Sequence, residues 1–225
     1  MSLHAWSSAR FLLPLPPGHR FPIEKYERLR QRVLDDGLVA LSHLHEPARV
    51  ADALLRLVHT DDYIERLSSG RLTEAEVRRI GFPWSPDLVE RSYRAVGGTC
   101  EAVARALATS GVAINLAGGT HHAFATHGEG FCVFNDVAVA VRHALTEGRI
   151  ARAAIIDLDV AAVRERSRQN ALRASAPAAT KPSPERAFAI RTTSDAARPT
   201  APSSSPTTSP ISTIFGSAAR RDLVV

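Results

Sequence analysis

Two groups of polar residues in this 225-residue chain could carry out chemistry together. His121 and His122 are adjacent imidazoles that directly follow the apolar run 112–117. Asp157 and Asp159 close another apolar run, 153–156. Because both runs are typical of buried parallel strands, we expect both groups at the carboxyl edge of one sheet, where open α/β sheets bind ligands. Imidazoles beside carboxylates suit metal-assisted hydrolysis, which needs a base for water and an acid for the leaving group.

Each of these groups also has a purely structural interpretation. Adjacent histidines occur by chance, and two aspartates at the end of a strand can simply include a cap for the next helix. Gly130 and Phe131, which lie between the two groups, can be a turn and a core aromatic. The position of His121 and His122 after a predicted strand, within a Gly-Gly-Thr-His-His sequence, favours the functional interpretation.

These residues must be positioned by helices and strands, and the hydrophobic pattern of the sequence predicts those of an α/β protein. Apolar spacing, caps and breakers predict helices near 23–36, 47–58, 86–108 and 135–147, one that starts after Thr60 and ends before Gly70, and a short one opened by a capping box at 73–76. They predict strands near 38–41, 112–117 and 153–158. The strand near 112–117, the helix near 135–147 and the strand near 153–158 form a βαβ unit, in which a crossover joins two parallel strands. The sequence therefore predicts a parallel sheet with helices on both faces.

Composition divides the chain into two parts, 1–160 and 161–225. The first part has 18 lysine and arginine residues against 19 aspartate and glutamate residues, together with all nine histidines. The second part is rich in Ala, Arg, Ser, Thr and Pro, and residues 195–210 contain no large apolar side chain, so we expect a disordered tail. Because the basic pI of about 9.8 comes from this tail, we expect no nucleic-acid partner for the domain.

Cysteine usage and the amino terminus bear on the compartment. Cys100 and Cys132 lack a metal-ligand spacing and are expected to be reduced thiols. The chain shows neither a secretory signal nor an 18-residue apolar span. We therefore expect a cytoplasmic protein with no membrane partner.

Several ordered motifs resemble the histone deacetylase superfamily, in particular its bacterial and class IV-like members. The motifs are Ala117–Ala123, Gly128–Asp136 and Asp157–Val160, preceded by Leu15–Pro22 and Val58–Tyr63. The resemblance extends from about residue 12 to Val160. It implies a three-layer, arginase/deacetylase-like α/β fold and a zinc-dependent deacetylase that hydrolyses the amide of acetyl-lysine or a related acetylated amine.

The resemblance also implies roles for individual residues. His121 and His122 match the catalytic pair that polarises water and moves protons to the leaving amine. Asp157 matches the carboxylate that orients the first histidine, and Asp159 matches a ligand of Zn²⁺. Many members also hold K⁺ in this region.

A second group of matches concerns the substrate and the surrounding motifs. Gly130 and Phe131 match the substrate tunnel, where the acyl-lysine stem passes an aromatic ring. His19, His59 and Tyr63 fall in matching motifs, but the sequence suggests no chemical role for them.

The resemblance ends abruptly after Val160. The family continues with His-x-Gly-x-Gly-Thr, whereas this chain has Ala161 at the position of the imidazole ligand and offers no later aspartate or tyrosine in matching surroundings. We therefore expect 1–160 to be a partial deacetylase domain and the chain as written to be inactive. Two origins remain open: a frameshift in a GC-rich gene, or a degenerate, catalytically dead paralogue that binds an acyl ligand or a partner. A nucleic-acid-binding tail is a third and weaker alternative.

Overall fold

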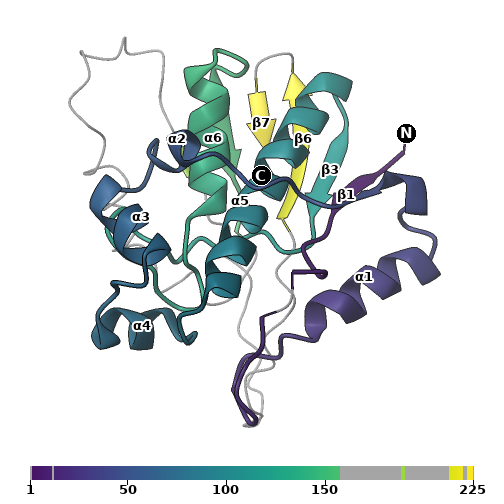
Figure 1. Ribbon diagram of the computed structural model, residues 1–225. Coiled ribbons are helices and arrows are strands. Elements are labelled where there is room, and N and C mark those ends of the chain that lie inside the picture. The colour runs from purple at the N-terminus through teal and green to yellow at the C-terminus, as the bar shows by residue number, and fades with distance from the viewer. Residues whose placement is uncertain (1, 12, 158–188, 191–212, 220–221, 225) are drawn as a thin grey trace, which may run out of the picture.

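The computed structural model describes residues 2–11, 13–157, 189–190, 213–219 and 222–224 (Figure 1). In chain order, the elements of these residues are β1 (His4–Trp6), α1 (Lys25–Asp35), the 3₁₀ turn η1 (Leu41–His43), β2 (Leu44–His45), α2 (Asp52–Leu55), α3 (Asp61–Ser68), α4 (Glu74–Ile80), α5 (Pro86–Thr109), β3 (Val112–Asn115), α6 (Asp136–Thr146), β4 (Arg152–Ile155), β5 (Ala189–Ile190), β6 (Thr213–Ala219) and β7 (Asp222–Val224).

The strands form one sheet in the order β2-β1-β3-β6-β7-β4-β5. β1 is parallel to β2 and β3, and β4 is parallel to β5 and β7. β6 is antiparallel to both β3 and β7, so β3 and β4 run in the same direction with two strands between them. The predicted parallel βαβ unit is thus present, but its strands are not neighbours, and their carboxyl ends lie at the same edge of the sheet.

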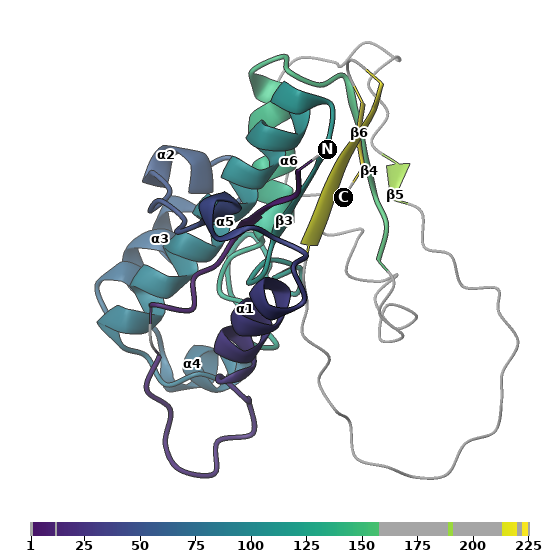
Figure 2. The ribbon, with the colours of Figure 1, turned by 90° about the vertical axis from the view of Figure 1, so that its right-hand side faces the viewer.

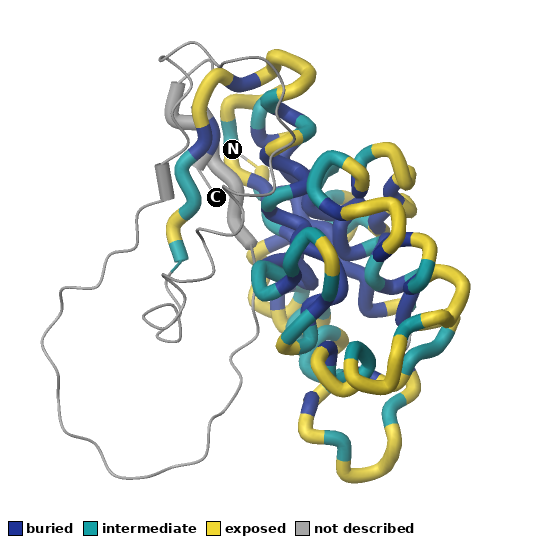
Figure 3. Tube along the Cα trace, turned by 90° about the vertical axis from the view of Figure 1, so that its left-hand side faces the viewer, coloured by how far each residue is buried: buried dark blue, intermediate teal, exposed yellow. Residues whose placement is uncertain are grey.

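Alternating side chains of β1 and β3 pack into separate clusters on the two faces of the sheet. Trp6 and Ala113 pack with buried residues of α5 and α6, whereas Ala5 and Ile114 pack with Val33 of α1. Figure 2 shows α5 and α6 beside the strands, and Figure 3 shows buried segments gathered in the interior of the described chain. The predicted α/β fold with helices on both faces is confirmed.

Helix α5 is the element that ties the sheet to the rest of the chain, and two glycines make its contacts possible. A Cβ at Gly97 would lie 1.9 Å from the carbonyl oxygen of Ala48, and one at Gly98 would lie 3.1 Å from Nδ2 of Asn115. Asn115, at the end of β3, uses this approach to donate hydrogen bonds to the carbonyl of Ala95 and the hydroxyl of Thr99. The two glycines thus let α5 pack closely against the Ala48 backbone and the end of β3.

Helix starts with strong local signals lie where the sequence predicts them. Thr73 and Glu76 form a complete capping box at α4, and Ser85 caps α5 with Pro86 at its first position. Thr60 likewise accepts a hydrogen bond from the backbone N–H of Tyr63 at the start of α3. In each case the side chain satisfies an N–H group that the helix itself leaves free.

Other predicted elements differ from the structure. The strand predicted at 38–41 is wrong, because the chain forms η1 there and pairs only at Leu44–His45. The helix predicted at 47–58 shrinks to α2, because residues 47–50 run against α5, where Arg94 donates to the carbonyl of Pro47 and Gly97 admits the Ala48 backbone.

Some strands were not predicted at all. Strand β1 was missed, and so were β5, β6 and β7, three short strands within residues 161–225. The predicted helical continuation over 161–174 and the predicted disorder of 195–210 fall outside the described residues. Among the described residues, no helix has the length and apolar character needed to span a membrane.

Candidate active site at the carboxyl ends of β3 and β4

The structure brings together three of the predicted catalytic residues. His121 and His122 lie in the loop after β3, with ring centroids 4.3 Å apart and ring planes 42° apart. Asp157 follows β4, and its Oδ2 lies 3.9 Å from Nε2 of His121, with both side chains partly exposed. This distance is too long for a direct hydrogen bond. The catalytic roles themselves remain predictions.

The predicted zinc ligand Asp159 lies outside the described residues. Within the described part of the chain, no group of three or more His, Cys, Asp or Glu side chains is arranged to hold a metal ion. The structure therefore places the imidazole pair and Asp157 and leaves the metal ligand unplaced.

The amino-terminal half of the histidine loop is anchored by Asp136, the first residue of α6. Its side chain is fully buried. Oδ1 accepts a hydrogen bond from the backbone N–H of Thr120 at 2.7 Å, and Oδ2 accepts one from that of Gly119 at 3.1 Å. The hydroxyl of Thr99 in α5 also donates to Oδ2. A buried carboxylate is stabilised by such donors and by the positive end of a helix dipole, so Asp136 fixes the backbone immediately before His121.

The carboxyl-terminal half of the loop is anchored by Asn135, the N-cap of α6. Its Oδ1 accepts from the N–H of Ala138, and its Nδ2 donates to the carbonyls of His121 and Ala123. The histidine loop therefore donates hydrogen bonds to Asp136 and accepts hydrogen bonds from Asn135, two consecutive residues at the start of one helix. The position of the two imidazoles is therefore set by the residue at which α6 begins.

His59 completes this framework. Its Nε2 accepts a hydrogen bond from the N–H of Asn135 at 3.0 Å, and its Nδ1 lies 2.9 Å from the carbonyl of Phe124. Since the first contact requires an unprotonated Nε2 and the second requires a proton on Nδ1, the imidazole is neutral. Burial lowers the pKa of His59 to about 4, against weaker opposing hydrogen bonds from the backbone. His59, for which the sequence suggested no role, thus holds the end of the histidine loop.

Of the two predicted substrate-binding residues, Gly130 lies against the ring of His122. A Cβ at Gly130 would meet Cγ of His122 at 3.4 Å, so the turn that contains Gly130 and Phe131 passes beside that ring. Both residues have positive φ, +59° and +66°, and Phe131 is one of two non-glycine residues with this conformation among those described. Their N–H groups donate to the carbonyls of Arg79 and Ile80 at the end of α4, which holds the turn in this conformation.

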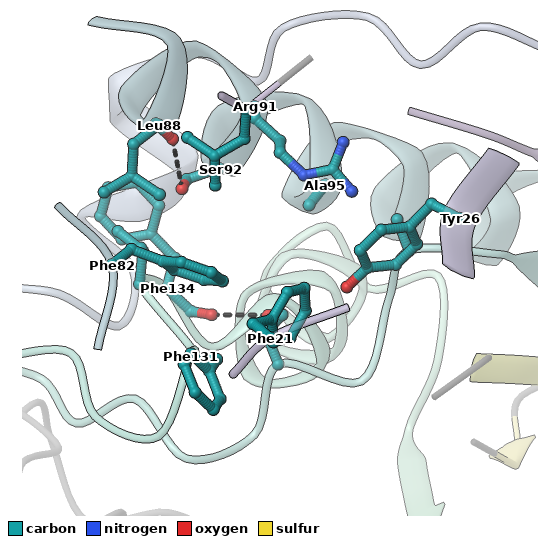
Figure 4. Close-up of a pocket in the computed structure, with 13 residues that line it drawn as sticks. Phe21, Tyr26, Phe82, Leu88, Arg91, Ser92, Ala95, Phe131 and Phe134 are labelled. Atoms are coloured by element: carbon teal, nitrogen blue, oxygen red, sulfur yellow. Dashed lines mark hydrogen bonds between the residues drawn. The ribbon is translucent and has the colours of Figure 1, made fainter. Parts of the chain in front are cut away.

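Beside this turn lies a small internal cavity of about 40 Å³ (Figure 4). Its wall is mainly aromatic, with the buried guanidinium of Arg91 on one side. The aromatic side chains and the guanidinium come from Phe21, Tyr26, Phe82, Arg91, Phe131 and Phe134. The Arg91 guanidinium donates to the carbonyls of Ser8 and Phe11 and lies 4.3 Å from the centroid of the Tyr26 ring. The cavity has room for a few water molecules and not for a drug-sized ligand.

The remaining motif residues have structural contacts. His19 lies 3.0 Å from the carbonyl of Gly81 and accepts from the N–H of Phe21, and the buried Tyr63 hydroxyl donates to the carbonyl of Val133 at 2.8 Å. His43 and His45 are half-buried beside His4.

Asp136 and Asn135 are the functional residues that the sequence analysis missed. Both lie in the Gly128–Asp136 motif, directly before the apolar run of α6. An Asn-Asp pair at that position is a recognisable helix N-terminus, and this signal could have identified them. What it could not reveal is that their side chains turn back onto the histidine loop.

Comparison with known proteins agrees with this geometry. Residues 19–162 match the family described as the histone deacetylase domain. An uncharacterised protein of Picosynechococcus sp. is 43% identical over 150 residues, which cover 67% of this chain and 50% of that protein. Histone deacetylase 2 of Arabidopsis thaliana is 35% identical over 63% of this chain and 38% of its own length. The acetoin utilization protein AcuC of Bacillus subtilis is 34% identical over 56% of this chain and 33% of its own.

Solved structures show the same fold. An HDAC homologue in complex with SAHA has a TM-score of 0.61 and 26% identity, over 71% of this chain and 45% of that one. The HDAC homologue from Aquifex aeolicus has a TM-score of 0.58 at 23% identity, over 69% of this chain and 44% of that one. The chain spans half or less of the length of each of these relatives. With the family match across more than half of its length, the chain belongs to the histone deacetylase family.

Proposed function

We propose that this chain carries the proton-transfer part of a zinc-dependent deacetylase site and that its substrate class is acetyl-lysine or a related acetylated amine. The observation that carries the proposal is the pair His121 and His122 held beside Asp157 at the carboxyl edge of the sheet. Amide hydrolysis requires a base that takes a proton from water and an acid that gives one to the leaving nitrogen, and imidazole does both near neutral pH. Asp157 orients His121, and Gly130 and Phe131 border the path of the acyl chain.

The donor set of the chain does not fit a catalytic zinc ion. Such sites take three protein ligands and leave a position for water or substrate. Here Asp159 is one carboxylate, and the following imidazole position is Ala161, which has no donor atom. The residues described in the structure add no group that could replace the missing ligands. Because this set is too small, the chain as written binds Zn²⁺ weakly and does not turn over acetylated amines, and we assign no K⁺ site either.

The genetic code permits a frameshift as the origin of this gap. In a frame displaced by one base, each codon takes the last base of one codon and the first two of the next. An Ala162 codon ending in G followed by the GT of Val163 then reads as glycine. An Arg164 codon ending in G followed by the GA of Glu165 reads as glycine, and a Glu165 codon ending in A followed by the CG of the next arginine reads as threonine.

The displaced frame therefore permits Gly-x-Gly-Thr at the third to sixth positions after Val160, where the family has these residues. The histidine at the first position does not follow from the shift alone, because Ala161 supplies GC and histidine needs CA. We accordingly propose that 1–160 is the family domain and that 161–225 is translated out of frame. A shift of this kind would remove the imidazole ligand and the later aspartate ligand while leaving Asp159 and the histidine framework in place.

The second candidate is a catalytically dead, deacetylase-like binding protein. It is favoured by the contrast between an intact histidine loop and the absence of a donor at Ala161. In either case we propose a cytoplasmic protein without nucleic-acid or membrane partners, since the net charge of the domain part is close to zero and the basic excess lies in 161–225.

The decisive experiment is to resequence the gene across the codons for 160–166 and to assay the chain as written, and the frame-restored chain, on an acetyl-lysine peptide with Zn²⁺. We expect turnover only from the frame-restored protein, and its loss on His121→Ala or His122→Ala. Metal-dependent turnover by the chain as written would refute its inactivity. If no frame restores the motif, SAHA binding without turnover would support the second candidate.

A further inference from the structure

Asp136 is an unusual carboxylate, because it is fully buried and forms no ion pair with any residue that the structure describes. Burial of a carboxylate is costly unless hydrogen-bond donors replace water. Its donors come from two separate parts of the chain: Thr99 in α5, and Gly119 and Thr120 in the histidine loop. One charged group thus joins the histidine loop to two helices.

The donors reaching Asp136 form a directed chain. Nδ2 of Asn115, at the end of β3, donates to the hydroxyl of Thr99 at 2.8 Å, and that hydroxyl donates to Oδ2 of Asp136. The charge at the far end polarises both bonds and strengthens them. The end of β3 and the start of α6 are therefore held at a fixed separation, with the histidine loop between them.

The same carboxylate can control His121 through the backbone. Oδ1 accepts from the N–H of Thr120, the residue immediately before His121, and also lies 2.8 Å from the Thr120 hydroxyl. The imidazole of His121 is 3.9 Å from Asp157 and has room to turn, because its side chain is partly exposed. A small rotation of the loop would move the ring out of reach of Asp157.

We propose that Asp136 is a positioning residue, and that its ionised carboxylate keeps the imidazole of His121 in register with Asp157. The proposal rests on the proposed function only for its consequence in catalysis; the test below does not require any catalytic activity. An amide cannot replace the carboxylate, although it has the same shape, because an NH₂ group would face N–H or O–H donors. The effect of Asp136 on His121 therefore depends on charge and acceptor geometry and not on volume.

The test is a double-mutant cycle read by NMR on the ring nitrogens of His121, whose signals are assigned by their absence in His121→Gln. In the unchanged protein, we expect Asp157→Asn to shift the ¹⁵N signals of His121 and to alter its tautomer balance. In an Asp136→Asn background, we expect Asp157→Asn to have little further effect. The matched control is Val139→Ala, a buried substitution on the same helix whose side chain packs in a core cluster that contains no residue of the histidine loop; it should lower stability yet leave the response to Asp157→Asn intact.

Two outcomes would overturn the proposal. One is a full response to Asp157→Asn in the Asp136→Asn background, and the other is an equal loss of response in Val139→Ala. If Asp136→Asn does not fold, Thr99→Val can replace it, because it removes one hydrogen-bond donor to Asp136. We expect Thr99→Val to reduce the response of His121 to Asp157→Asn in part, and Thr99→Ser to restore it. A full response in folded Thr99→Val would equally contradict the proposal. Because the readout needs no turnover, it fails or succeeds independently of the deacetylase assay.

Discussion

The imidazole of His59 accepts a hydrogen bond from the backbone N–H of Asn135, at 3.0 Å. The two residues are 76 positions apart in the sequence, and the contact joins the start of α3 to the start of α6. It exists only while Nε2 of His59 is unprotonated, because that nitrogen is the acceptor. The stability of the histidine loop is therefore linked to the protonation state of a residue outside it.

Acid should destabilise the protein through His59. Its pKa is about 4 in the folded chain and about 6.5 in the unfolded chain, so the unfolded state binds more protons between these values. The stabilisation is complete above pH 6.5 and is lost as the pH falls toward 4, by about 3 kcal/mol in total. Urea unfolding at pH 7 and pH 4.5 measures this loss.

The variant that isolates the effect is His59→Gln, compared with His143→Gln in the last turn of α6. We expect His59→Gln to be less stable at pH 7 by about 1–3 kcal/mol, since buried backbone partners lose their hydrogen bonds, and to show a weaker pH dependence between pH 6.5 and 4. His143→Gln should change neither quantity much. An unchanged pH dependence in His59→Gln would contradict the linkage.

A second acid-sensitive contact lies at the β1–β2 edge. Arg105 donates to Nε2 of His4 at 2.7 Å, so a neutral His4 carries its proton on Nδ1 and donates it to Nε2 of His45 at 2.8 Å. Burial, followed by the charge of Arg105, lowers the pKa of His4. The other titratable groups that act on His4 are His43, which is stacked on it, and His45.

Protonation should therefore loosen β1 from β2. Because the folded pKa of His4 is depressed, this contribution is present above the ordinary value of about 6.5 and is lost as the pH falls below it. The fluorescence of Trp6, whose ring lies 4.8 Å from that of His45, reports the change in a Trp84→Phe background. Arg105→Gln keeps a donor but removes the charge, so its acid transition should occur at higher pH. A transition that stays in place or moves to lower pH would refute this account.

The packing of α5 against residues 47–50 gives a steric prediction. Gly97→Ala would place its Cβ 1.9 Å from the carbonyl oxygen of Ala48, a backbone atom that cannot turn away. We expect a loss of at least about 2 kcal/mol despite the roughly 1 kcal/mol that alanine gains in helix propensity. Gly98→Ala meets Asn115 at 3.1 Å and should cost less. Chemical denaturation of the two variants measures the difference, and equal costs would contradict the contact.

The sequence predicts those parts of the fold that depend on local chemistry. The start of α5 follows from Ser85 and Pro86, and that of α4 from the Thr73 capping box, because caps satisfy N–H groups within one turn. The length of α2 and the order of the strands depend instead on distant contacts. The Ala48 backbone runs along α5 only because Gly97 lies opposite it, and β3 pairs with β1, which lies at the other end of the domain sequence. No local pattern contains that information.

The candidate site divides along the same line. His121 and Asp157 could be placed together because the ends of parallel strands share an edge, and the structure brings them to 3.9 Å. The roles of Asp136 and His59 could not be predicted in this way. Each depends on a side chain at the start of a helix that contacts the histidine loop or its anchor. The residues that could do chemistry are visible in the sequence, whereas those that hold them in place require the fold.

The last prediction concerns the turn beside His122. Gly81 ends α4 with φ +87°, and a Cβ there would lie 2.9 Å from Cε1 of Phe131. We expect Gly81→Ala to cost about 2–3 kcal/mol, from backbone strain plus the clash with the ring. Gly37→Ala is the matched control, because Gly37 has φ +64° after α1 with nothing within 4 Å of its Cβ position, so it should cost only the strain, about 1 kcal/mol. Phe131→Leu should relieve the clash, so that Gly81→Ala costs less in that background in urea unfolding. Strictly additive losses would show that the ring of Phe131 does not rest on Gly81.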